Sequence, residues 1–66
     1  MMYKDFMRMT YHSPLSEEVR ERIAKAYNKL QRVVLFNDLS IKDANALNDI
    51  GYPVQKEGDK IKVQIR

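Results

Sequence analysis

Side chains that could act in catalysis are few in this chain. His12 is the single histidine and the only residue whose ordinary pKa lies near neutrality, so it is the first candidate for a general base or a metal ligand. A metal site needs three or four ligands, and the carboxylates of the sequence stand at no recognisable spacing from His12. We therefore expect an exposed loop histidine with no catalytic, metal-binding or cofactor-binding role.

The other candidates for chemistry have structural explanations. The positive end of a helix dipole would stabilise the negative charges of Glu17, Glu18 and Glu21. Two of these glutamates also stand one turn before a cation, Glu18 before Arg22 and Glu21 before Lys25, and can form ion pairs with them. Three serines stand where helix caps are expected: Ser13, Ser16 and Ser40. The chain has no cysteine and no glycine-rich phosphate motif, and so small a domain rarely encloses a substrate pocket. We expect a protein that is not an enzyme and has no small-molecule substrate.

A stripe of cations indicates binding rather than catalysis. Arg22, Lys25, Lys29 and Arg32 follow one another at spacings that gather them on one side of a helix. A solvated helix face has the same appearance, and the functional alternative is a ridge that contacts phosphates or carboxylates. The outer face of a predicted hairpin adds two lysines. A nucleic-acid interface would therefore rest on six residues: Arg22, Lys25, Lys29, Arg32, Lys60 and Lys62.

Apolar residues outside the predicted core favour a protein interface. The first nine residues are rich in methionine, and Phe6 falls on the polar side of its segment, unless that segment folds over the following helix. Leu35 and Phe36 lie off the apolar stripe of that helix, on opposite sides. An uncovered apolar patch marks an interface, so we expect a protein partner or a second copy of the chain to contact Phe6, Met7, Met9, Leu35 and Phe36.

Two elements are predicted to position these residues. The alternation of Met7, Met9 and Tyr11 with polar residues predicts a strand over 6–11. A long amphipathic helix over 15–35 follows, capped by Ser13 or Ser16. Its apolar stripe comprises Val19, Ile23, Ala26, Leu30, Val33 and Val34.

The second half of the chain predicts a short helix and a hairpin. Ser40 is the expected cap of a helix over 41–50, which Gly51 and Pro53 end. The alternating residues at the C-terminus predict a β-hairpin in one of two registers. A turn at Gly58-Asp59 sets Val54 opposite Val63, whereas a turn at Glu57-Gly58 sets Val54 opposite Ile61.

These elements define a single small α+β domain over residues 1–66, in the order β-α-α-β-β. We expect a three-stranded sheet whose C-terminal hairpin packs against the long helix and the short second helix. The net charge of +3 is mild and permits contact with nucleic acid without requiring it. No apolar run approaches the roughly 18 residues that a membrane span needs, so we expect a cytoplasmic protein that does not bind membranes.

Two functions fit the sequence. We expect a non-catalytic binding or regulatory module that contacts a protein partner and self-associates. The alternative is a basic module that contacts nucleic-acid phosphates through the first helix and the hairpin, without strong sequence specificity. Its element order is similar to that of a winged-helix DNA-binding domain lacking the first helix. The second helix differs from a helix that reads bases, because it carries Asp43 and Asp49 and only one cation, Lys42. Its net negative charge would be repelled by the phosphates of the nucleic acid.

Overall fold

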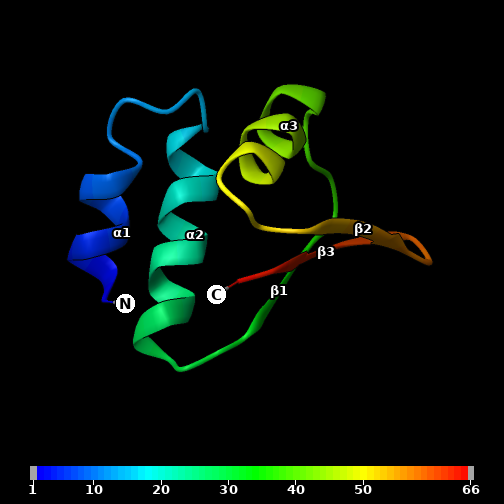
Figure 1. Ribbon diagram of the computed structural model, residues 1–66. Coiled ribbons are helices and arrows are strands. Elements are labelled where there is room, and N and C mark those ends of the chain that lie inside the picture. Colours follow the sequence, from blue (N-terminus) through cyan, green and yellow to red (C-terminus); the bar gives the residue numbers. More distant parts are fainter. Residues whose placement is uncertain (1, 66) are drawn as a thin grey trace.

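Residues 2–65, which the computed structural model describes, form three helices and a three-stranded antiparallel sheet (Figure 1). The elements in chain order are α1 (Tyr3–Met9), α2 (Glu17–Asn28), β1 (Val33–Phe36), α3 (Ile41–Asp49), β2 (Val54–Glu57) and β3 (Lys60–Gln64). The predicted α+β class, the sheet of three strands and the C-terminal hairpin are confirmed. The N-terminal element and the origin of the third strand differ from the prediction.

The strand predicted over 6–11 is wrong, because the segment forms helix α1. Phe6 and Thr10 are buried and Met7 is half-buried, a spacing that belongs to one face of a helix, while Met9 is half exposed. That face packs on α2. The guanidinium of Arg20 holds the two helices together by donating to the Thr10 hydroxyl (3.0 Å) and to the Met7 carbonyl (2.6 Å).

Helix α2 begins two residues later than predicted, at Glu17, and ends earlier than predicted. Of the two proposed caps the chain uses Ser16, whose hydroxyl accepts a hydrogen bond from the Val19 amide. The helix ends at Asn28 rather than at residue 35, and Val33–Phe36 become the third strand, β1. A run rich in β-branched and aromatic side chains suits a half-buried strand. Val34 and Phe36 point into the core, and Val33 and Leu35 point outward.

The second half of the chain matches its prediction closely. The Ser40 hydroxyl accepts from the Asp43 amide (3.1 Å) and caps α3, and Gly51 follows that helix with a φ of 88°. The hairpin adopts the register that sets Val54 opposite Val63, with Gly58 in its turn. The strand order β1-β3-β2 places the last strand in the centre of the sheet.

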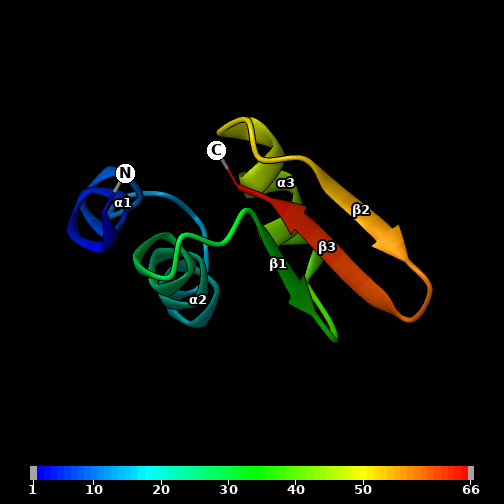
Figure 2. The same ribbon diagram turned by 90° about the horizontal axis from the view of Figure 1, so that it is seen from below.

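The helices and the sheet surround one core. Helix α3 lies against one face of the sheet, α2 stands beside β1, and α1 lies on the far side of α2 (Figures 1 and 2). The rings of Tyr27 and Tyr52 lie 5.7 Å and 5.8 Å from the Phe6 ring, and their hydroxyls share a hydrogen bond. The largest fully buried apolar side chains are Phe6, Ile23, Leu47 and Val63. None of the three helices within residues 2–65 covers the face of the sheet away from α3 (Figure 2).

A buried carboxylate joins the starts of α2 and α3. Asp43 is 5% exposed and accepts hydrogen bonds from the Ser16 amide (2.8 Å) and from the Ser16 hydroxyl (3.0 Å). Two helix N-termini, each with a partial positive charge, therefore surround one negative side chain. This contact ties the start of α2, the helix that carries Arg22 and Lys25, to the start of α3.

Candidate functional site

The cations of α2 converge on a hollow beside β1. Arg22, Lys25 and Lys29 line a depression of about 270 Å³ between the C-terminal half of α2 and the chain entering β1. The rest of its lining is Ala26, Gln31 and Val34. Of the six cations proposed to contact nucleic acid, the structure thus brings three together.

The other three predicted cations lie elsewhere. Arg32 is exposed but does not line the hollow. Lys60 and Lys62 belong to β3, where Lys60 donates to the side chain of Asn37 and Lys62 pairs with Glu57 (3.3 Å). These two lysines of β3 therefore already have partners, and only three of the six cations lie together at the hollow.

Arg22 contacts the edge of the sheet at two points. Its guanidinium donates to the Leu35 carbonyl (2.7 Å) and lies 4.3 Å from the centre of the Phe36 ring. The Arg32 carbonyl points toward β3, because it accepts a hydrogen bond from the Ile65 amide. Backbone carbonyls alternate in direction along a strand, so the Leu35 carbonyl, three residues later, points away from β3 toward the free edge of the sheet. Arg22 thus satisfies an edge acceptor, in place of its predicted pairing with Glu18.

The remaining cations of the hollow differ in their partners. Lys25 pairs with Glu21 (3.7 Å), as predicted, and the two side chains are 62% and 45% exposed. Lys29 forms no ion pair within residues 2–65. One exposed cation at the hollow is therefore unpaired with any described residue, and a second has only a surface ion pair, which is weak.

Leu30 stands between two residues that line the hollow and has an unusual conformation. Its φ is 58°, a left-handed value that no other non-glycine residue within 2–65 shares, and its side chain is 89% exposed. The Gln31 amide donates to the Ala26 carbonyl (3.0 Å) and the Leu30 amide to the Tyr27 carbonyl (3.2 Å). This is the Schellman end of a helix, at which glycine normally occupies the left-handed position.

Sequence periodicity missed Leu30 because it falls on the apolar stripe of α2. The stripe predicted a core residue, but α2 ends before Leu30 and leaves the side chain in solvent. No glycine marks the helix end, so the sequence carries no signal for it. We refer to Leu30 together with Arg22, Lys25 and Lys29 as the Leu30 surface.

The residues predicted for a protein interface divide between core and surface. Phe6 and Phe36 are 0% and 4% exposed, which corrects their placement at a surface, since α1 folds over α2 and β1 turns Phe36 inward. Met7 is half-buried, whereas Met9 and Leu35 are about half exposed. Met9 lies on α1 and Leu35 on β1, with α2 between these elements (Figure 2). The five residues therefore do not form one patch.

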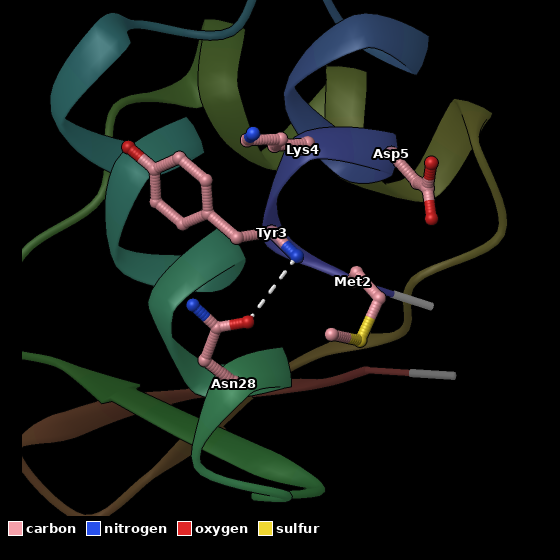
Figure 3. Close-up of a pocket in the computed structure, with 5 residues that line it drawn as sticks. All are labelled: Met2, Tyr3, Lys4, Asp5 and Asn28. Carbon is pink, nitrogen blue, oxygen red and sulfur yellow. Dashed lines mark hydrogen bonds between the residues drawn. The ribbon is translucent and has the colours of Figure 1, made fainter.

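A second hollow lies between the start of α1 and the end of α2 (Figure 3). It measures about 520 Å³ and is lined by Met2, Tyr3, Lys4, Asp5 and Asn28. The Tyr3 amide donates to the Asn28 side-chain oxygen (3.4 Å). The side chains of Lys4 and Asp5 point in different directions, so this hollow does not bring an acid and a base together (Figure 3).

His12 lies exposed in the loop after α1, as expected, with the Tyr11 ring 4.8 Å from its own. Within residues 2–65 no three His, Asp or Glu side chains are grouped as metal ligands. None of the helices in that range has the length and apolar character needed to cross a membrane. Comparison with protein-family models, with curated proteins and with solved structures gives no match for this chain.

Proposed function

We propose that this protein is a non-catalytic binding module and that a protein partner docks on the Leu30 surface. The observation that carries the proposal is the combination of left-handed backbone and 89% exposure at Leu30. A leucine in this conformation costs about 1–2 kcal/mol, and an exposed side chain returns little of that by burial. Residues that break a local rule without benefit to the fold are expected where function requires them.

A docked partner supplies the benefit that the fold lacks. Burying a leucine side chain against a protein contributes about 1.5–3 kcal/mol, which exceeds the cost of its backbone conformation. Val33 and Leu35, which point outward from β1, add further exposed apolar area on the adjoining strand. An apolar anchor with a rim of cations resembles the centre and edge of many protein interfaces.

Nucleic-acid binding is the second candidate, favoured by the convergence of Arg22, Lys25 and Lys29 on one hollow. Phosphates would pair with these cations, but a phosphate backbone offers Leu30 no apolar contact. The lysines of β3 do not line that hollow, so they would add little to a phosphate contact there. We therefore place a protein partner first.

Self-association is not part of the proposal at this surface. A two-fold dimer brings the same patch of both copies together, so the cations of the two Leu30 surfaces would face one another. A homodimer remains a prediction for α1, where Met9 is half exposed.

Affinity capture tests the proposal. The full chain and its Leu30→Gly variant are used as baits in nuclease-treated extract of the cells that express the protein, with Ile41→Ala as a control at an exposed apolar residue on α3. We expect a protein captured by the wild type and by the Ile41 variant and lost with Leu30→Gly. Equal capture by all three baits would reject docking at Leu30.

A further inference from the structure

The structure assigns a chemistry to the partner: we infer that the Leu30 surface binds an acidic, apolar peptide segment, whose large apolar residue covers Leu30 and whose carboxylate enters the hollow of Arg22, Lys25 and Lys29. This inference rests on the proposed function and specifies its partner. It follows from the charges, the shape of the hollow and the position of the leucine.

The charge of the hollow selects an anion. Its lining contains three cations and no acidic residue, and the adjoining Glu21 is already paired with Lys25. A carboxylate placed there would meet Lys29, which has no ionic partner within residues 2–65, and the partly occupied Lys25. Charge complementarity of this kind determines which partners are accepted and which are repelled.

Arg22 is prepared to hold a carboxylate. The Leu35 carbonyl and the Phe36 ring fix its guanidinium, while only one of its five N–H donors is used in the contact with Leu35. A guanidinium that is already immobile loses little rotamer freedom on binding. The hollow thus contains one guanidinium that is positioned by contacts with β1 and two exposed lysines.

The size and lining of the hollow suit a side chain. A volume of about 270 Å³ is below that of most drug-sized pockets, and Ala26 and Val34 give it an apolar part. Leu30 lies in the sequence between the lining residues Lys29 and Gln31. A carboxylate and a large apolar side chain close together on one segment would therefore contact both features.

Two other anionic surfaces are less suitable. A nucleic acid leaves Leu30 without an apolar contact. An anionic membrane would accept leucine and lysine together, but it presents a broad surface, whereas the cations here surround a hollow. Both become outcomes of the test.

Fluorescence anisotropy with the full chain provides that test. The probe is a labelled peptide in which two leucines stand between two pairs of aspartates, compared with one peptide carrying asparagine for aspartate and one carrying serine for leucine. We expect saturable binding of the first peptide only. Lys29→Gln and Leu30→Gly should each weaken it about fivefold or more, whereas the matched surface changes Lys42→Gln and Ile41→Ala leave it unchanged.

Several results would overturn the inference. Equal binding of the asparagine peptide would show that no carboxylate is recognised. Absence of saturable binding would reject an acidic peptide segment as the ligand. Tighter binding of phosphatidylserine-containing vesicles or of a random-sequence DNA duplex, with the same dependence on Lys29 and Leu30, would make a membrane or a nucleic acid the occupant. If peptide binding fails while Leu30→Gly still loses the captured protein, the acidic segment is rejected and the proposed function stands; unchanged capture rejects the function itself.

Discussion

Leu30 is the residue at which this sequence departs most clearly from what its fold favours. We predict that Leu30→Gly raises the free energy of unfolding by about 0.5–1 kcal/mol, because relief of the left-handed strain exceeds the entropy that glycine adds to the unfolded chain. Urea unfolding followed by circular dichroism measures the change. A loss of stability would show that the leucine packs in the fold, and the argument for a partner would fail.

Asp43 stabilises two helices, its own helix α3 and the start of α2. It is a member of the α3 cap, and the fold also uses its carboxylate to hold Ser16 at the start of α2. We predict that Asp43→Ala costs about 2–4 kcal/mol, since it leaves the Ser16 donors without their charged partner, whereas Asp43→Asn costs less because one acceptor remains. Asp49→Ala, an exposed change on the same helix, is the control in denaturant unfolding. Equal effects of Asp43→Ala and Asp49→Ala would contradict this account.

At the scale of the elements, the chain could be predicted where the signals are local. Capping serines, the glycines of the two turns and strict alternation located α3 and the hairpin. They left two registers open for the hairpin, and the pairing of Val54 with Val63 decides between them. The end of α2 could not be predicted, because a leucine occupies the position where glycine would signal a stop, and the apolar stripe continues across it. The run Val33–Phe36 suits a helix or a strand, and only the pairing with β3 decides between them.

The prediction of a strand at the N-terminus is wrong because two patterns overlap in one short segment. Its methionines alternate like the residues of a strand, while the buried pair Phe6 and Thr10 follows helical spacing. Both patterns are present in one short segment, and packing against α2 selects the helical one. For the candidate site, the sequence grouped Arg22, Lys25 and Lys29, which line one hollow, together with Arg32, which does not. It gave no sign that Leu30, between the lining residues Lys29 and Gln31, is exposed.

The free edge of β1 depends on one side chain from α2. Arg22→Ala removes the hydrogen bond to the Leu35 carbonyl and the contact with the Phe36 ring, and we predict a loss of about 1–2 kcal/mol. Lys25→Ala, which breaks only an exposed ion pair on the same helix, should cost less than about 0.5 kcal/mol. Thermal unfolding of the two variants side by side measures the difference, and equal losses would show that Arg22 does not support the edge.

For the molecule as a whole, the ring cluster of Phe6, Tyr27 and Tyr52 joins α1, α2 and the approach to β2. Burial, and next the hydrogen bond with Tyr27, raises the pKa of Tyr52 above its ordinary value. The unfolded chain therefore loses the Tyr52 proton at a lower pH than the folded chain does. The contribution to stability is complete below about pH 10 and falls as the pH rises above it.

We predict that the free energy of unfolding decreases between about pH 9.5 and 11, and that Tyr52→Phe makes this decrease shallower because phenylalanine has no proton to lose. Urea unfolding at a series of pH values in this range gives both slopes. Identical slopes for the wild type and Tyr52→Phe would show that the burial of Tyr52 does not govern the alkaline limit.

The central claim is that Leu30 is retained for a partner at the expense of the fold, and one paired measurement tests it most directly. Wild type and Leu30→Gly are compared for free energy of unfolding and for affinity toward the protein captured by the wild type. We predict that the glycine variant is the more stable protein and binds at least about tenfold more weakly, as expected when an interface anchor is lost. A glycine variant that binds the captured protein as tightly as the wild type would contradict the account.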